Sequence, residues 1–171
     1  PPVARLRGGR SHSVYLSQLA KAGVQFPAIV RAAGTHTGRV IGVFRQPEDV
    51  LPALVGNRDY YATRFANFRS PDGLYRKYRV FMIAGKPVLR HMLAGDSWDI
   101  HAANRNAFMA DRADLQLEEA RLMGKGFSPK VRDVFAAIHQ RMGLDFFGID
   151  FALTPDEHVI LFEANATMNF F

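Results

Sequence analysis

Hydrophobic and polar residues alternate along the first half of the chain in short runs, most of them bounded by glycine or proline. Runs in which every second residue is apolar predict strands, and apolar residues at spacings of three and four predict helices. The predicted elements are a helix capped by Ser13 and ended by Gly23, strands over 26–33, 39–45 and 60–65, and a helix over 48–55. Because residues 34–38 are bounded by glycines, we expect the first two strands to form a hairpin.

The second half begins with a turn at residues 70–73 and continues with two hairpins separated by two helices. The predicted elements are strands over 75–84 and 87–93, helices over 107–123 and 129–142, and closing strands over 145–153 and 158–164. Ser128 suits the cap of the second helix, Pro129 its first position and Gly143 its end. Because strands and helices follow in mixed order and the strand pairs are antiparallel, the pattern predicts an α+β fold.

The composition is that of a folded globular protein. Hydrophobic residues make up 48% of the 171 residues and charged residues 22%, which excludes a disordered chain. The absence of cysteine excludes a disulfide scaffold, a thiolate zinc site and a cysteine nucleophile, and a cytoplasmic location is expected. No apolar run approaches the roughly 18 residues of a membrane span, so no membrane partner is expected. The first residues contain no signal-peptide core and no starting Met, which predicts a fragment of a longer protein.

The net charge is positive, since 22 Lys and Arg residues outnumber 16 Asp and Glu residues and give +6 at pH 7. This balance favours anionic partners, which include nucleotides, nucleic acids and acidic substrates. The most basic run is Tyr75-Arg76-Lys77-Tyr78-Arg79. Alternation along a strand directs Lys77 and Arg79 to one face and Arg76 and Tyr78 to the other, so the run is not one surface.

Two carboxylates face each other in the predicted C-terminal hairpin. With the turn at 155–158 centred between its two middle residues, Asp150 lies opposite Glu163 and Gly148 lies opposite Asn165. Alternation then places three polar side chains, those of Asp150, Glu163 and Asn165, on one face. The other face is predicted to be core and carries Phe147, Ile149, Phe151, Leu153, Ile160, Phe162 and Ala164.

Like charges directly opposed on a sheet are destabilising, so the two carboxylates require compensation. Oxygen-only ligands of this kind select Mg²⁺ or Mn²⁺, and the side chain of Asn165 adds an oxygen without charge. Gly148 is predicted to leave room for the ligand to approach. The alternative is an edge hairpin whose polar face meets water, with arginines pairing the acids, and a one-residue slip of register would remove the site. The hairpin alone leaves both interpretations open.

A second candidate is the glycine-bounded loop and the arginines around it. Glycine tolerates the backbone angles with which a loop turns its N–H groups toward an anion. The candidate phosphate-binding residues are Arg31, Gly34, Thr35, His36, Thr37, Gly38 and Arg39. The loop is not a Walker loop, because no Gly-Lys-Ser/Thr is present and no helix begins there. The alternative is a simple hairpin turn, with His36 at the surface.

Two arginines on adjacent predicted strands are candidates for the chemistry itself. Arg79 and Arg90 each carry a forked guanidinium that can hold an acyl or phosphate oxygen. The alternative for each is a solvated arginine or one paired with a carboxylate. His91, His101 and His139 do not have the spacing of a zinc site and are interpreted as structural or surface residues.

From about residue 26 to residue 165, the chain resembles the ATP-grasp superfamily, in particular the branch of glutathione synthetase and the ribosomal-protein glutamate ligase. The most specific part is Gly148-Ile149-Asp150 followed by Leu161-Phe162-Glu163-Ala164-Asn165. In that family an Asp, a Glu thirteen residues later and an Asn two residues beyond hold two Mg²⁺ ions on the phosphates of ATP. Asp150, Glu163 and Asn165 have this spacing, so the resemblance implies ATP and Mg²⁺, or Mn²⁺, as cofactors.

The resemblance extends to four other segments. Residues 26–31 look like the strand that ends in a phosphate-binding Lys, with Arg31 in that position, and residues 34–38 look like the flexible glycine loop. Residues 78–81 and 89–90 are similar to the strand pair that carries substrate- and phosphate-facing arginines. Residues 63–65 stand where the family offers backbone to adenine, which makes Arg64 and Phe65 candidates for nucleotide binding.

The resemblance implies two lobes, residues 1–65 and 66–171, that grip ATP between them. It also implies a reaction in which a small-molecule or peptide carboxylate is phosphorylated and an amine, or a thiol, displaces the phosphate.

The sequence departs from the family in three ways. Arg31 replaces Lys, Gly148 stands where some relatives place Arg, and Asn165 is not followed by Ser/Thr-Pro-Gly. The usual N-terminal substrate domain is missing, and we expect it elsewhere in the same protein.

Two other functions compete with the ligase. The first is a module that binds nucleotide without ligase activity. The second, less favoured, is a basic nucleic-acid-binding domain, for which affinity would fall steeply with salt.

Overall fold

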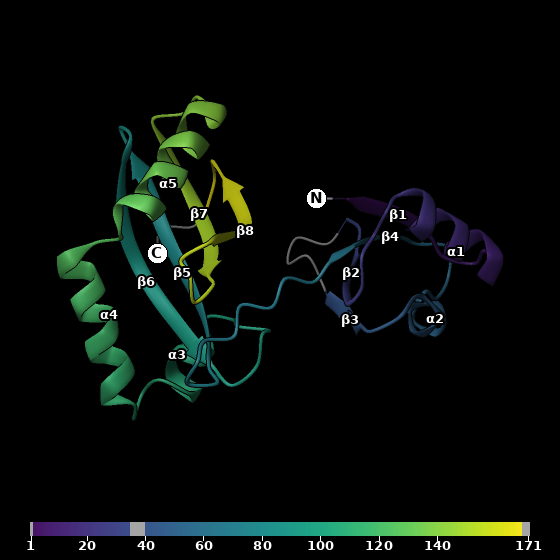
Figure 1. Ribbon diagram of the computed structural model, residues 1–171, viewed down its shortest axis with the longest axis horizontal. Helices are drawn as coiled ribbons and strands as arrows, with labels where there is room; N and C mark the ends of the chain where they lie inside the picture. Colours follow the sequence, from purple (N-terminus) through teal and green to yellow (C-terminus); the bar gives the residue numbers. More distant parts are fainter. Residues whose placement is uncertain (1, 35–39, 169–171) are drawn as a thin grey trace. The chain divides into compact units, whose positions relative to one another are not determined.

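The protein is described here by a computed structural model that covers residues 2–34 and 40–168. The chain divides into two compact units, Pro1–Ala66 and Asn67–Phe171, each with its own antiparallel sheet and core (Figure 1). Sequence analysis places a boundary after residue 65, and the assignment of the two parts as nucleotide-gripping lobes stays a prediction. In the described residues, no helix has both the length and the apolar character that crossing a membrane requires.

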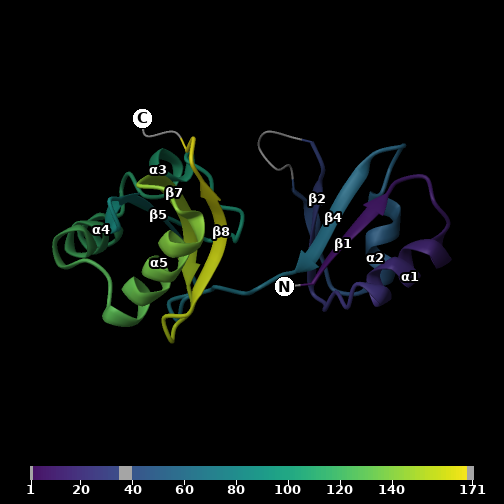
Figure 2. The same cartoon turned by 90° about the horizontal axis from the view of Figure 1, so that it is seen from above.

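The first unit is a four-stranded sheet with strand order β1-β4-β2-β3 and short helices on one face (Figure 2). Its elements are β1 Val3–Arg7, α1 His12–Lys21, β2 Ala28–Ala32, β3 Val40–Phe44, α2 Pro47–Val50, the 3₁₀ helix η1 Leu51–Ala53 and β4 Asp59–Arg64. The predicted hairpin of the second and third strands is confirmed, because Ala28 pairs with Phe44 and Val30 with Gly42.

Strand β1 is absent from the sequence-based prediction. It pairs antiparallel with β4, with Ala4 opposite Ala62 and Leu6 opposite Tyr60. All four of these residues are buried, whereas the residues between them on β1 are exposed, so β1 does follow a two-residue alternation. Five residues with arginines at alternate positions give only a weak signal of it. The first helix begins after Ser11, not after Ser13, and its buried residues include Tyr15 and Leu19.

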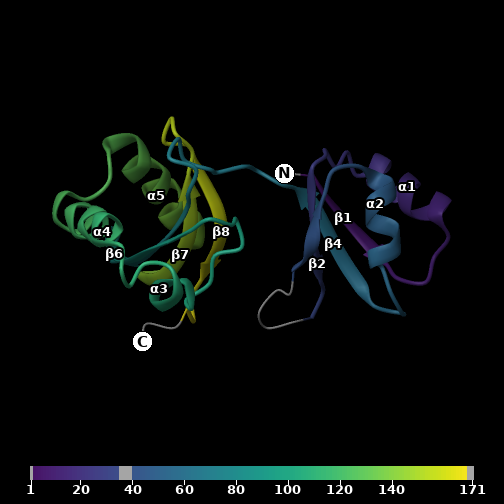
Figure 3. The same ribbon diagram turned by 90° about the horizontal axis from the view of Figure 1, so that it is seen from below.

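The second unit contains a sheet with strand order β6-β5-β7-β8, and its two long helices cover one face (Figures 2 and 3). Its elements are β5 Tyr75–Ile83, β6 Lys86–Gly95, α3 Asn104–Ala107, α4 Ala113–Lys125, α5 Pro129–Met142, β7 Phe146–Leu153 and β8 Val159–Asn165. Both predicted hairpins are present, since β5 pairs with β6 and β7 pairs with β8.

Helix α5 has the predicted bounds, because each of its signals is local. The Ser128 hydroxyl accepts a hydrogen bond from the Val131 backbone N–H at 3.4 Å, and Gly143 ends the helix with φ at 62°. Val131 and Phe135 face the sheet and are fully buried. The rings of Phe135 and Phe151 meet edge to face with centroids 5.0 Å apart, so this helix is anchored on the core face of β7.

Helix α4 begins later than predicted, at Ala113 instead of Ala107. The Gln116 side-chain amide donates to the backbone carbonyls of Met109 and Ala110 and holds the preceding residues in a turn. On the same helix, buried Glu119 accepts the Met92 backbone N–H at 2.9 Å and a forked pair of hydrogen bonds from Arg105. Glu119 therefore joins α4 to β6, and all of its partners are structural.

Candidate functional site

Four polar residues form one row across the sheet of the second unit. The strand register places His91 of β6 opposite Arg79 of β5, Arg79 opposite Asp150 of β7, and Asp150 opposite Glu163 of β8. On β5 and β7 the residues before and after the row belong to the core packed under α4 and α5. Because side chains alternate along a strand, Arg79 and Asp150 point to the face of the sheet that α4 and α5 leave uncovered (Figure 3).

The predicted pairing of the carboxylate hairpin is confirmed at the residues that matter. Asp150 pairs with Glu163 and Gly148 with Asn165. Next to the turn the pairing is nevertheless one residue out of the predicted register, with Leu153 opposite Val159, and a bulge between Asp150 and Phe151 restores the register. The bulge has a consequence for Phe162, whose predicted place in the core is wrong. It is 39% exposed, and its ring contacts that of Phe68 at a centroid distance of 5.2 Å.

Asp150 is enclosed by two cationic side chains. Only 2% of the surface of Asp150 is exposed. Arg79 donates from Nε to Oδ1 at 2.6 Å and from Nη2 to Oδ2 at 2.8 Å, and Lys77 Nζ lies 2.7 Å from Oδ2. Burial alone would raise the pKa of Asp150, but the hydrogen bonds from Arg79 and Lys77 outweigh it and hold the pKa below its ordinary value. The carboxylate is therefore ionised, and both of its oxygens are in contact with positive charge.

Glu163 and Asn165 lie beside Asp150 on the edge strand. Glu163 is exposed, and its Oε1 accepts a hydrogen bond from the Asn165 side-chain amide at 2.9 Å. Asn165 Oδ1 in turn accepts the Thr167 backbone N–H at 2.8 Å. The Glu163 charge reaches Arg79, whose pKa is raised first by its hydrogen bond to Asp150 and then by the charges of Asp150 and Glu163. One network thus connects the predicted metal ligands to the predicted catalytic arginine.

The donor set fits a hard divalent cation. Asp150 and Glu163 offer carboxylate oxygens from directly opposed positions, and Asn165 offers an amide oxygen two residues along the same edge strand. Mg²⁺ takes one or two protein carboxylates and completes its shell with phosphate or water oxygens. Over residues 2–34 and 40–168 no three His, Asp or Glu side chains gather as a metal site, and the Asn165 amide is the third protein ligand that the predicted set contains.

The space beside Gly148 is filled, which corrects the expectation that this glycine leaves room for a ligand. A Cβ built on Gly148 would lie 2.7 Å from Cβ and 2.9 Å from Cγ of Met168. Met168 is itself 8% exposed. The residues after Asn165 therefore return over the sheet, and the absence of a side chain at Gly148 serves packing against Met168.

Gly148→Ala is expected to destabilise the second unit by about 1–3 kcal/mol, since the added methyl overlaps Met168 in a packed region. Adding Met168→Ala should recover most of the loss. Gly124→Ala in α4, where a Cβ meets nothing within 4 Å, is the matched control and should not destabilise. Urea unfolding followed by the fluorescence of Trp98, the single tryptophan, measures all of these variants. Equal effects at Gly148 and Gly124 would contradict the packing argument.

The other candidates of the second unit are less closely tied to the row. Arg90 lies at an irregularity of β6, between Leu89, which pairs with Val80, and His91, which pairs with Arg79. Its side chain is exposed. The roles predicted for Arg79 and Arg90 stay predictions, and Arg79 is the one that the network contains.

The nucleotide-binding candidates of the first unit lie on β2 and at the end of β4. Arg31 is exposed and pairs with Tyr61 and Val40, and Arg64 is exposed opposite Ala28. Phe65 donates its backbone N–H to Pro27 at 2.8 Å, and Gly34 has φ at 70°. Thr35, His36, Thr37, Gly38 and Arg39 lie outside the described residues. The roles assigned to all of these residues stay predictions.

No protein-family model matches the sequence, and no curated protein gives a significant sequence match. Solved structures do match. One is N5-carboxyaminoimidazole synthase from Aspergillus clavatus, solved with ADP and 5-aminoimidazole ribonucleotide, with a TM-score of 0.53 and 14% identity over 96% of this chain and 39% of that one. Another is the ATP-grasp ligase PsnB, solved with a minimal precursor, with a TM-score of 0.50 and 13% identity over 99% of this chain and 47% of that one.

The chain has the ATP-grasp fold. This confirms the predicted fold class, two antiparallel sheets with flanking helices. At identities this low the likeness concerns the fold alone, and the chain spans less than half the length of either protein. In this ATP-grasp fold, the polar row crosses all four strands of the second sheet, from His91 on β6 to Glu163 on β8.

Sequence reasoning missed two residues of this polar face. Alternation directs Lys77 to the same face as Arg79, but its contact with Asp150 depends on the pairing of β5 with β7, in which Arg79 and Asp150 are 71 positions apart in the chain. His91 was interpreted as structural or surface, and it lies in the row itself. The signal for both was the alternation of β5 and β6, which becomes informative only when the neighbouring strand is known.

His91 is expected to make the second unit less stable in acid. Burial, followed by the charge of Arg79, lowers the pKa of His91 to about 4, while Asp150 acts in the opposite direction and Arg90 and Arg105 reinforce the lowering. The folded state keeps the imidazole neutral and the unfolded chain protonates it near pH 6.5, so stability is present above that pH and is lost as pH falls toward 4.

Between pH 7 and pH 4, the free energy of unfolding of His91→Asn should fall by about 1–2 kcal/mol less than that of the wild type. This range allows for solvent screening of the half-buried histidine. Urea unfolding at several pH values, read by Trp98 fluorescence, measures this difference. His158→Asn, at an exposed histidine in the β7–β8 turn, is the control. Parallel pH profiles for His91→Asn and the wild type would contradict the prediction.

Proposed function

We propose that this chain is an ATP- and Mg²⁺-dependent ligase domain that joins a carboxylate to an amine, or to a thiol, through an acylphosphate. The observation that carries the proposal is the row of Arg79, Asp150 and Glu163, with Asn165 beside it, on the helix-free face of an ATP-grasp sheet. Asp150 and Glu163 are opposed carboxylates, and Asn165 supplies a neutral oxygen. These residues would hold Mg²⁺, which supplies neutralising charge at the phosphates of ATP.

The arginine of the row has a defined part in the proposed reaction. A substrate carboxylate oxygen forms a bond to the γ-phosphorus, the bond to the β–γ bridging oxygen breaks, and ADP leaves. The amine then bonds to the acyl carbon, inorganic phosphate leaves and the amine loses a proton to solvent. Arg79 is proposed to orient the transferred phosphoryl group, and its two hydrogen bonds to Asp150 through Nε and Nη2, which fix the guanidinium, support this role. Arg90 on the next strand is proposed to contact substrate oxygens.

The finer assignments belong to the same proposal. They are the glutathione synthetase and glutamate ligase branch, a peptide or small-molecule acid as substrate, a cytoplasmic location and a substrate domain elsewhere in the protein. Arg31, Gly34, Thr35, His36, Thr37 and Gly38 are proposed to contact phosphates, and Arg64 and Phe65 to lie near adenine.

Isothermal titration with Mg·ATP, combined with phosphate release measured across carboxylate–amine pairs, tests the proposal. Binding that requires Mg²⁺ and is lost in Asp150→Asn, together with phosphate release that depends on an added pair, is the expected result. Absence of Mg·ATP binding by the folded wild-type chain would overturn the proposal.

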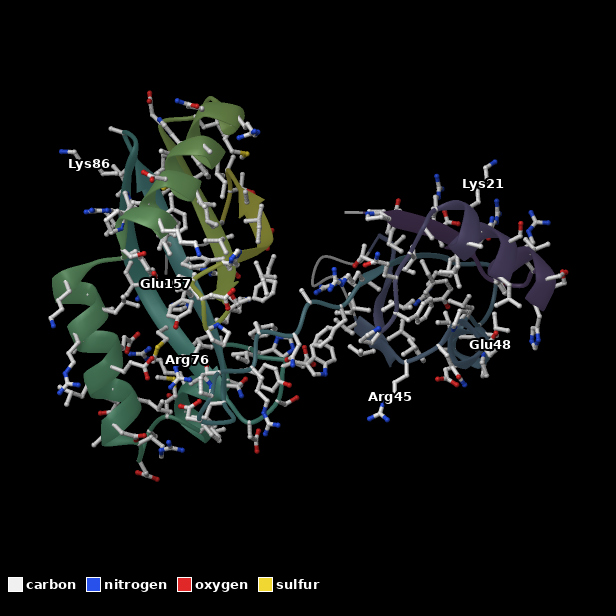
Figure 4. All side chains as sticks on the ribbon, viewed as in Figure 1. Lys21, Arg45, Glu48, Arg76, Lys86 and Glu157 are labelled. Carbon is white, nitrogen blue, oxygen red and sulfur yellow. The ribbon has the colours of Figure 1, made fainter. Side chains whose placement is uncertain are left out.

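A nucleotide-binding module without ligase activity is the second candidate. It is favoured by one observation, that Arg31 stands where the family that the sequence resembles has a phosphate-binding Lys. Mg·ATP binding with no phosphate release for any pair would support it. The contacts of the basic run 75–79 do not support a nucleic-acid-binding surface there. Arg76 lies on the helix side of the sheet (Figure 4), where it forms ion pairs with Asp72 and with Glu118, each at 2.7 Å.

A further inference from the structure

Two cationic side chains contact Asp150. Lys77 and Arg79 both contact Oδ2, and Arg79 also contacts Oδ1. These contacts use three of the about four lone-pair sites of the carboxylate, and both sites of Oδ2 are in use. A divalent cation that binds Oδ2 therefore competes with Lys77 or with Arg79.

Lys77 is the cation that can move. Arg79 is held through two parallel hydrogen bonds in a planar fork, and such a fork resists displacement. Lys77 makes one contact through a compact ammonium group at the end of four rotatable methylenes, and its side chain is 23% exposed. Its departure leaves Asp150 with both Arg79 contacts, Nε to Oδ1 at 2.6 Å and Nη2 to Oδ2 at 2.8 Å.

The charge balance indicates where Lys77 goes. Lys77 and Arg79 together balance Asp150 and Glu163, so a divalent cation entering alone would leave an excess of about two positive charges in a mostly buried region. A polyphosphate supplies the missing negative charge. The displaced ammonium then lies one strand away from the metal ligands and is a natural partner for a phosphate oxygen.

We propose that Lys77 is a phosphate-binding residue of this site which neutralises Asp150 in the absence of nucleotide and exchanges from Asp150 to a nucleotide phosphate when metal and nucleotide bind. This inference rests on the proposed function. The exchange makes Lys77 a barrier to metal binding without nucleotide and an aid to metal binding with nucleotide.

The two opposite effects give the test. Lys77→Gln removes the charge but keeps a side-chain donor for Asp150, so the variant is expected to fold. Its affinity for Mn²⁺ alone, measured by electron paramagnetic resonance, should rise at least about fivefold, because a positive charge within contact distance is gone. Its affinity for Mg²⁺ with a non-hydrolysable ATP analogue, measured by titration calorimetry, should fall at least about fivefold.

Lys86→Gln is the matched control. It lies at the β5–β6 turn, at the opposite end of β5 from Arg76, and it is exposed (Figure 4). Both affinities of this variant should equal those of the wild type. Lys77→Arg, which keeps the charge, should retain analogue binding without tighter Mn²⁺ binding, and Lys77→Met should repeat the Lys77→Gln pattern if Gln disturbs folding.

The outcomes separate this inference from the function on which it rests. If the wild type binds the Mg²⁺–analogue complex but Lys77→Gln matches Lys86→Gln in both titrations, the exchange is wrong and the ligase proposal stands. If Lys77→Gln weakens both affinities, Lys77 only supports the fold around Asp150, and the exchange is again wrong. If the wild type binds no analogue, both proposals fall.

Discussion

Glu163→Gln should weaken Mg·ATP binding at least about tenfold and leave the stability of the protein unchanged. The substitution removes one of two opposed carboxylates while keeping the shape of the side chain, and losses of 10- to 100-fold are usual even for residues that only support a metal ligand. Because Glu163 is exposed and accepts one hydrogen bond from the Asn165 amide, its neutralisation should change the free energy of unfolding by no more than about 0.5 kcal/mol.

Titration calorimetry at several Mg²⁺ concentrations measures the effect, because loss of a metal ligand shifts the Mg²⁺ dependence as well as the affinity. Glu157→Gln is the control. Glu157 is an exposed glutamate in the turn of the same hairpin, two residues before β8 begins. An affinity and a Mg²⁺ dependence that match those of Glu157→Gln would show that Glu163 is an ordinary surface acid.

The sequence predicts the pairing of Asp150 with Glu163 correctly partly because two departures from a regular hairpin cancel each other. Pro155 and the residues after it indicate a turn, and counting outward from that turn gives Asp150 opposite Glu163. The pairing next to the turn is one residue out of that register, and the bulge beside Asp150 cancels the difference. A bulge inserts one unpaired residue, and nothing in an apolar run such as 159–162 distinguishes it from regular alternation. Phe162 is therefore the residue whose surroundings could not be predicted.

The contacts of Asp150 were beyond sequence reasoning for a different reason. Alternation within β5 correctly separates Lys77 and Arg79 from Arg76. It does not say that β5 pairs with β7, since the two strands are separated in the chain by a hairpin strand and three helices. The interpretation in which arginines pair the acids and the interpretation in which a metal does so both stay predictions. Arg79 and Lys77 pair with Asp150, whereas Glu163 accepts a hydrogen bond from Asn165. The two are compatible if a bound metal displaces one cation.

The position of Met168 shows a further limit. A glycine in a strand beside candidate ligands indicates that something approaches closely, and either a ligand or a neighbouring side chain can satisfy that requirement. The packing of Met168 on Gly148 depends on how the chain turns after Asn165, where Thr167 donates its backbone N–H to the Asn165 side chain. No periodicity predicts such a local return of the chain.

Arg79→Met is expected to destabilise the second unit by about 2–4 kcal/mol. Asp150 keeps its negative charge in a site where its side chain is 3% exposed, and Oδ1 loses its charged donor. Removing one partner of a buried ion pair costs more than the pair contributes, because the remaining charge stays buried, here with Lys77 as its remaining cationic contact. Asp150→Asn combined with Arg79→Met should recover more than half of this loss, since the uncompensated charge is then gone.

Arg112→Met is the matched control for this result. Arg112 binds Asp114 through the same two atoms, Nε at 2.9 Å and Nη2 at 2.7 Å, but the two side chains are 40% and 62% exposed. Its loss should cost less than about 1 kcal/mol, as for other solvated pairs. A double-mutant cycle over Arg79 and Asp150, followed by urea unfolding, gives the coupling energy. A coupling no larger than that of Arg112 and Asp114 would mean that burial adds nothing to the pair and that Asp150 is as accessible to a metal as a surface carboxylate.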